Sequence, residues 1–247
     1  MANKIEQGSF GRVRVFNDFL GNSVSTVPTT TFVQLAGNLG CISVSVANTA
    51  LAGTVDEPGG ILAITTHSDD DDNCAIFAGV FKAADGGCVM EARFKMDSIL
   101  LSAVFCGFSE TLAVTTPVMP AEFATETLDF VATGNVVGMV YDKDANTADW
   151  RAAFGNDNVA VAGSDANGTR AYEAPVLNEW DIVRVEVGAD GDGWCYLNGR
   201  LIKTVKDAVT TTDMLHAVLM IENRSGVARL FEVDYFYAEG GRDWTDS

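Results

Sequence analysis

Apolar and polar residues alternate along much of this chain, most clearly over Cys88–Met96. Every second residue of this segment is apolar, while the residues between them include Glu91, Arg93 and Lys95. A period of two is typical of a β-strand that turns one face to a core and the other to water. The segment therefore predicts a half-buried strand.

Similar signals recur at short intervals, separated by turn residues such as "AADGG", "TGN", "GND" and "ENRSG". None of the segments keeps an apolar pattern at helical spacing over three turns. The further predicted strands are Val13–Phe16, Cys74–Lys82, Leu100–Phe108, Leu128–Ala132, Val136–Tyr141, Trp150–Phe154, Asn158–Val161, Ile182–Val187, Leu215–Ile221 and Val227–Tyr237. With the hairpin after Val187 they make roughly twelve strands, which predicts an all-β protein with a single antiparallel β-sandwich of the jelly-roll type.

No linker, charge block or internal repeat divides the 247 residues. We therefore expect residues 1–20 to form an N-terminal arm with the first strand, and residues 21–247 to form one jelly-roll domain. For the Ser-, Thr- and Gly-rich segment Gly21–Pro58, the sequence leaves two alternatives, which are two edge strands or a long loop. Two predicted strands, Cys74–Lys82 and Leu100–Phe108, are apolar on both faces, so a loop or a neighbouring molecule should cover their outer side.

The turn Asn198-Gly199 lies between alternating segments and predicts a type I′ hairpin, since both residue types accept positive φ. In the strand before it, Trp194 and Tyr196 share one face and Cys195 and Leu197 the other.

Composition narrows the class of protein. A hydrophobic content of 47% with 20% charged residues fits a water-soluble globular protein, and no apolar run is long enough to span a membrane. The net charge of −18 argues against nucleic-acid binding, which needs clustered basic residues. Because Lys4, Arg12 and Arg14 make the first 20 residues slightly basic, they are candidates for docking to an acidic partner.

The five cysteines are far apart and mostly within apolar runs, which favours free, buried thiols. The N-terminus "MANKIEQGSFGR" lacks the apolar stretch of a signal peptide, so we expect synthesis in a reducing cytoplasm.

Catalytic and cofactor motifs are sparse. The chain has no Gly-x-Ser-x-Gly, no phosphate-binding loop and no Glu-x-Asp-x-x-Glu of the kind that places two glycosidase carboxylates on one strand face. We expect no catalytic residues and no cofactor. His67 precedes "SDDDDN" in a predicted solvated turn, and His216 should pack within or at the rim of its strand.

One loop has part of a calcium pattern. Asp142, Asp144 and Asn146 occupy positions 1, 3 and 5 of "DKDANTADW", but Thr147 replaces the glycine at position 6 and Ala153 the glutamate at position 12. These three residues are the candidate metal ligands, against the alternative of an acidic exposed loop.

The segments "VMEARFKMDS...VFCGFSE", "NEWDIVRVEVGADGDGWCYLNGRLI" and "FEVDYFYAEGGRDW" resemble, in this order, the concanavalin A-like lectin/glucanase superfamily, including its laminin-G-like jelly rolls. The segments "RVFNDFLG" and "VVGMVYDKDANTADWRAAFGNDNVAV" are similar to jelly-roll structural proteins of tailed bacteriophage virions. The second resemblance implies a non-enzymatic capsid decoration protein that sits on the virion surface.

This resemblance also implies partners. They would be the major capsid protein or other virion proteins, with further copies of the chain as a homo-oligomer, a trimer being one arrangement.

The alternative hypothesis is a carbohydrate-binding module for host-surface glycans, with Trp150, Trp194 and Trp244 as stacking candidates. A third is a glycosidase that uses an unrecognised carboxylate pair such as Glu91 with Asp234.

Overall fold

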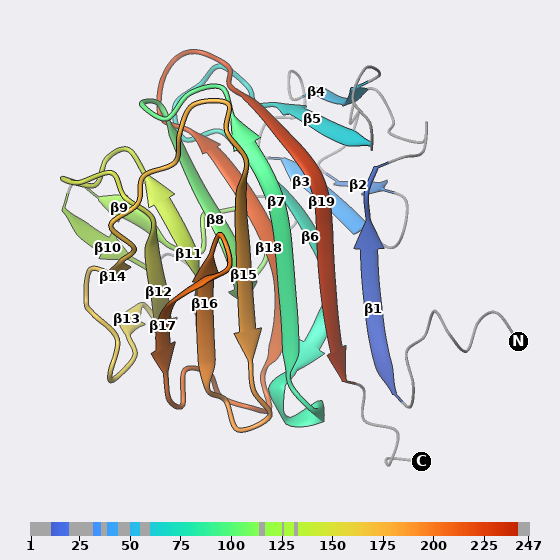
Figure 1. Ribbon diagram of the computed structural model, residues 1–247, viewed down its shortest axis with the longest axis vertical. Helices are drawn as coiled ribbons and strands as arrows, with labels where there is room; N and C mark the ends of the chain where they lie inside the picture. Colours follow the sequence, from blue (N-terminus) through green and yellow to red (C-terminus); the bar gives the residue numbers. More distant parts are fainter. Residues whose placement is uncertain are drawn as a thin grey trace, which may run out of the picture.

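The computed structural model describes residues 11–19, 32–35, 39–43, 50–54, 60–113, 117–124, 126–130 and 133–241. Strands make up nearly all of the regular structure in these ranges, and two antiparallel sheets lie face to face (Figure 1). The predicted all-β sandwich is confirmed. None of the helices in the described ranges has the length and apolar character that a membrane crossing requires.

The first sheet, called the front sheet, has eight strands. In spatial order they are β17 (Arg200–Val205), β16 (Gly193–Leu197), β15 (Asp181–Val187), β7 (Cys88–Met96), β19 (Leu230–Gly241), β5 (Ile61–Thr65) and β4 (Ala50–Thr54), with β1 (Arg12–Asn17) also beside β19.

The second sheet, called the back sheet, has nine strands. In spatial order they are β13 (Val159–Ala160), β12 (Arg151–Asn156), β11 (Asn135–Asp142), β8 (Ser102–Ser109), β18 (Met214–Asn223), β6 (Asn73–Lys82), β3 (Leu39–Ser43) and β2 (Phe32–Leu35), with β14 (Thr169–Arg170) beside β12. A separate hairpin pairs β9 (Glu122–Ala124) with β10 (Thr127–Asp129), and a 3-10 turn, η2 (Ala83–Asp85), joins β6 to β7.

The main core lies between the two sheets. Strand β7 shows the predicted alternation, because its residues are buried and partly exposed in turn from Cys88 to Met96. Phe94 of this strand packs edge-on against Trp150, with ring centroids 5.9 Å apart. All five cysteines are free and buried, as predicted.

A second apolar cluster lies on the outer side of the back sheet. All eight residues of β8 and all eight of β11 are buried, so these strands are covered on both faces. The cover comes from the same chain: Met119, Phe123 and Phe130 pack against the cluster that contains Phe105. The two-sided apolar pattern of these strands therefore needs no neighbouring molecule, and it carries no information about a partner.

The first strand predicted in the N-terminal segment is present as β1. Strand β1 pairs with β19 over its whole length, from Arg12 opposite Gly241 to Asn17 opposite Phe236. Val15 and Phe19 belong to the main core. The described part of the predicted arm is thus an edge strand of the sandwich. Within Gly21–Pro58, the described residues form the edge strands β2 and β4 and the strand β3, which lies between β2 and β6.

Candidate functional site

The outward face of the front sheet carries a group of polar and aromatic side chains that share one surface. Period-two alternation turns Glu91 and Arg93 of β7 outward while Met90 and Ala92 face the core. Strands β15 and β16 alternate in the same way, with Arg184 and Trp194 partly exposed. The segment that covers the back sheet does not extend over this face in the described residues.

Strand register aligns these side chains in rows. One row runs across neighbouring strands through Phe16, Tyr237, Glu91, Arg184 and Tyr196, each directly opposite the next. The adjacent row runs through Arg14, Glu239, Val89, Glu186 and Trp194. The first row therefore has charged groups at its centre and aromatic rings at both sides, whereas the second has charged groups on either side of Val89 and one aromatic ring, Trp194, at its end.

The centre of the first row is a hydrogen-bonded group. The Tyr235 hydroxyl donates to Glu91 Oε1 at 2.7 Å, and Arg184 Nη1 lies 3.3 Å from Glu91 Oε2. Arg184 Nε also donates to Glu186 Oε1 at 2.6 Å. Burial, followed by the hydrogen bond to Glu91, raises the pKa of Tyr235. The phenol is therefore a neutral donor, not a nucleophile.

Glu239 anchors the edge of the same face. Its side chain is only 8% exposed and lies 2.6 Å from Arg12 Nη1 and 2.8 Å from Arg14 Nη2. Burial alone would raise the pKa of Glu239, but hydrogen bonds from Tyr237, Arg12 and Arg14 outweigh burial and lower the pKa to about 2. This carboxylate is ionised whenever the protein is near neutral pH.

These groups surround a shallow hollow of about 490 Å³. Its lining consists of Arg14, Phe16, Glu91, Arg184, Tyr235 and Tyr237. A smaller hollow of about 230 Å³ follows along the same face and shares Arg184 with the first, while Glu186 and Trp194 line its far side. The two hollows share Arg184 and lie beside each other on the front sheet, and we call them together the trough, a surface that suits an extended ligand with several polar groups.

The two carboxylates considered for a glycosidase, Glu91 and Asp234, form ion pairs with different arginines. Asp234 accepts from Arg93 Nη1 at 2.6 Å, whereas Glu91 faces Arg184 and Tyr235. Each carboxylate is thus held in its own ion pair on the front face.

The candidate calcium ligands are not arranged around an open position. Asp142 is buried and accepts from Arg224 Nη2 at 2.8 Å and from the backbone N–H groups of Phe123 and Asp144. Asp144 pairs with Lys143, and Asn146 is exposed. An arginine side chain takes the place that a cation would need beside Asp142.

Two of the three basic candidates of the N-terminus form ion pairs within the front sheet. Lys4 lies outside the described residues, and Arg12 and Arg14 turn to Glu239 of β19. Both arginines are about half exposed, so they fix β1 to the sheet and also border the hollows.

The three tryptophans considered for stacking on a sugar differ in where they lie. Trp150 is completely buried, and its indole N–H donates to Asp181 Oδ2 at 3.1 Å, so it cannot stack on a sugar. Trp194 lines the smaller hollow, and Trp244 lies outside the described residues. The sequence did not single out Phe16, Tyr235 or Tyr237, although alternation along β19 puts the two tyrosines on one face.

The hairpin turn at Asn198-Gly199 has positive φ at both residues, 50° and 79°. Asn198 also ties the turn to its surroundings, since its side chain accepts from Ile182 N at 2.8 Å and donates to Asp181 at 3.0 Å. Its role is structural.

Comparison with solved structures defines this architecture. A protein of unknown function from Shewanella oneidensis MR-1 aligns with 100% of this chain and 95% of its own, with a TM-score of 0.57 and 13% identity. The Emp47p carbohydrate recognition domain aligns over 92% of this chain and 98% of its own, with a TM-score of 0.52 and 11% identity. The fold is the concanavalin A-like jelly roll.

A 1,3-alpha-1,4-beta-D-galactose-4-sulfate-3,6-anhydro-D-galactose 4 galactohydrolase has a similar fold, with a TM-score of 0.51, 13% identity and coverage of 92% of this chain and 93% of its own. At these identities the likeness defines the fold alone. No protein-family model and no curated protein matches the chain.

Proposed function

We propose that this protein binds a glycan in the trough across the front sheet. The observation that carries the proposal is the larger hollow, in which Phe16, Tyr235 and Tyr237 lie together with Glu91 and Arg184. Sugar rings have apolar faces that pack on aromatic side chains and hydroxyl groups that hydrogen-bond to charged ones. Both kinds of group occur here within one hollow.

The arrangement supports binding without cleavage. Glu91 and Asp234 are each neutralised by an arginine, and Tyr235 keeps its proton. A glycosidase needs one carboxylate as acid and another as nucleophile or base across a shared cleft. The carbohydrate recognition domain and the galactohydrolase with this jelly roll lend support only at the level of the fold.

A glycan array tests the proposal directly. The array carries neutral, uronic and sulfated oligosaccharides, and the highest-affinity ligand is then titrated against the protein by calorimetry. We expect at least one ligand above background and no new reducing ends after prolonged incubation. An array without any signal would overturn the proposal.

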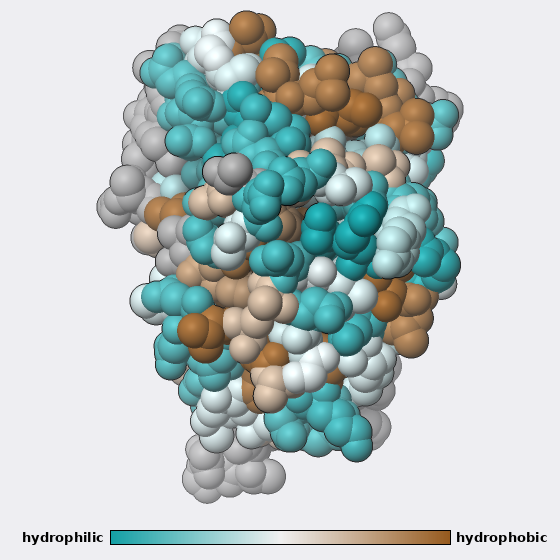
Figure 2. All heavy atoms as spheres, turned by 90° about the vertical axis from the view of Figure 1, so that its left-hand side faces the viewer, coloured by the Kyte–Doolittle hydropathy of each residue, from teal (hydrophilic) through white to brown (hydrophobic). Residues whose placement is uncertain are grey.

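A second candidate function is a structural role on a virion surface, with a capsid protein as partner. The observation that favours it is a group of exposed apolar side chains on the loops at one end of the sandwich: Leu100, Val176 and Leu177 are 74%, 52% and 48% exposed. A hydrogen bond from Asn178 N to Met96 O brings these loops together. Figure 2 shows hydrophobic side chains gathered at the upper end of the face that it draws. Clusters of this kind often mark protein contacts.

Co-sedimentation with capsids tests the second candidate. A Leu100→Asp, Leu177→Asp double variant should lose its association with capsids. The control variant Val159→Asp, which changes an exposed apolar residue of β13, should keep it. Equal sedimentation of both variants would remove the apolar end as the contact surface.

A further inference from the structure

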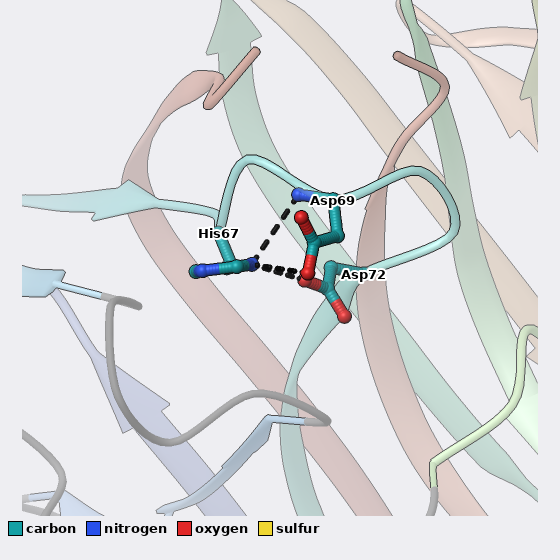
Figure 3. Close-up of side chains that lie close together, drawn as sticks. All are labelled: His67, Asp69 and Asp72. Atoms are coloured by element: carbon teal, nitrogen blue, oxygen red, sulfur yellow. Dashed lines mark hydrogen bonds and ion pairs between the residues drawn. The ribbon is translucent and has the colours of Figure 1, made fainter. Parts of the chain in front are cut away.

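The loop between β5 and β6 brings together three side chains able to bind a metal ion. Nδ1 of His67 lies 2.6 Å from Asp72 Oδ2 and 3.3 Å from Asp69 Oδ2. Figure 3 shows the two carboxylates converging on the same ring nitrogen from one side. All three potential ligand atoms lie within 4.8 Å of one another.

Two carboxylate oxygens lie close to the same ring nitrogen, Nδ1 of His67, which carries at most one proton. The backbone N–H of Asp69 lies 3.3 Å from Nδ1, a long contact that a bound cation would replace, because an unprotonated ring nitrogen has only one lone pair. The two carboxylate oxygens are also acceptors, and a proton on Nδ1 could be donated well to only one of them. A cation held between the three atoms would satisfy the nitrogen and both carboxylates together. The mixed nitrogen and oxygen set distinguishes this group from an ordinary acidic loop.

The backbone of the loop is held independently of the three side chains. Asn223, at the end of β18, donates from Nδ2 to the carbonyls of His67 and Asp69, each at 3.2 Å. Its backbone exchanges two further hydrogen bonds with Asp71 and Asp72, at 2.8 Å and 3.0 Å. The loop is therefore fastened to the back sheet at both ends, so the ligand positions exist before an ion arrives.

Exposure leaves one side accessible. The side chains of His67 and Asp72 are 14% and 13% exposed, whereas that of Asp69 is 76% exposed. An ion would enter on the Asp69 side and keep water on its remaining position.

From this geometry we propose a zinc site formed by His67 Nδ1, Asp69 Oδ2 and Asp72 Oδ2. Zinc binds imidazole nitrogen and carboxylate oxygen at about 2.1 Å in tetrahedral geometry, which places two ligand atoms about 3.4 Å apart. The separation of His67 and Asp69, 3.3 Å, already matches, and Asp72 has to retreat by less than about 1 Å. Calcium is the poorer fit, because it takes six to eight oxygen ligands.

The site is tested on the full chain with the metal alone. Calorimetric titration of the metal-free protein with zinc chloride should show one tight site, and the same protein with cobalt chloride should give the visible absorption of tetrahedral cobalt. Asp69→Asn should weaken zinc binding at least about tenfold. Because Asp69 is exposed, this variant should fold. Asp70→Asn is the matched control, since it removes the same charge from the same exposed loop without touching the three ligand atoms.

His67→Gln should abolish both the zinc heat and the cobalt spectrum, with folding checked by circular dichroism. Absence of zinc binding, equal loss in Asp69→Asn and Asp70→Asn, or tighter binding of calcium than of zinc would each overturn the proposal. The result is independent of the glycan trough, since the trough and this loop have no residue in common.

Discussion

Arg224 Nη2 lies 2.8 Å from Oδ2 of Asp142, whose side chain is fully buried. The same guanidinium meets Glu222 at 2.7 Å, Glu122 at 2.8 Å and Asp71 at 2.7 Å. Asp142 in turn accepts from the backbone of Phe123 in the segment that covers the back sheet. One arginine therefore joins a back-sheet strand, the covering segment and the loop of the proposed zinc site.

Arg224→Met should destabilise the fold by about 3–5 kcal/mol, because it leaves the buried carboxylate of Asp142 without its cation. Urea denaturation measures the change. Arg200→Met is the control, since Arg200 forms an ion pair with Glu173 while its side chain is 53% exposed. A surface pair of that kind should cost less than about 1 kcal/mol. Equal effects of the two variants would contradict the role given to Arg224.

Glu222 should make the protein less stable as the pH rises from about 4.5 to 8. Burial raises the pKa of Glu222 from 4.5 to about 8, against the opposing effect of Arg224. Since the unfolded chain loses this proton at lower pH than the folded one, the free energy of unfolding falls between the two values.

Glu222→Gln should therefore unfold at a higher urea concentration than the wild type at pH 8. The difference in free energy of unfolding between the variant and the wild type should be smaller at pH 4 than at pH 8, by at least about 1 kcal/mol. A pH-independent effect of the substitution would contradict the raised pKa.

Removal of β1 should damage the fold and not only an attachment site. Deletion of residues 1–19 takes away the pairing with β19, the ion pairs to Glu239, and the buried side chains of Val15 and Phe19. Loss of the two core side chains alone should cost roughly 3 kcal/mol or more. Deletion of residues 1–10 removes none of these contacts and is the control. Thermal unfolding of both truncated proteins gives the comparison.

Acid should release β1 as well. The pKa of Glu239 is lowered to about 2, so the stability from its ion pairs is complete above its ordinary value of 4.5 and disappears as the pH falls from 4.5 toward 2. Glu239→Gln should remove this part of the acid dependence. Proteolysis of β1 followed by mass spectrometry across this pH range measures the release.

In the glycan trough, Arg184→Met should weaken binding of the ligand found on the array by about tenfold, equivalent to one or two lost hydrogen bonds to a charged group. The fold should survive, since the side chain is 39% exposed. Tyr172→Phe is a control outside the trough, because Tyr172 is 81% exposed and lines neither hollow. Unchanged affinity in Arg184→Met would move the binding site away from this face.

Local pattern was enough to predict much of the fold. The alternation over Cys88–Met96 coincides with β7, and Trp194 and Tyr196 face away from the core while Cys195 and Leu197 are buried. These features depend on residues close together in the sequence, because strand faces alternate with a period of two. The strand β5 (Ile61–Thr65) was missed, since its short apolar run has no clear alternation and lies beside an irregular segment.

The candidate site depended on contacts that no local pattern contains. Asp142 has the spacing of a calcium ligand, but Arg224, 82 residues later, neutralises it. The apolar outer face predicted for Leu100–Phe108 left a loop and a neighbouring molecule equally open, and the structure shows Phe123 and Phe130 packed in the cluster that covers this strand, β8. Both outcomes follow from which distant segments fold against each other.

The sequence by itself determined the class of fold, the faces of its best-patterned strands, the buried thiols and the turn at Asn198-Gly199. Only the tertiary structure decided which side chains share a surface. Glu91 and Tyr235 are 144 residues apart, yet the pairing of β7 with β19 places them 2.7 Å from each other. The reason is that strand register, which aligns one strand's side chains with those of the next, is set by packing across the whole sandwich and not by either strand alone.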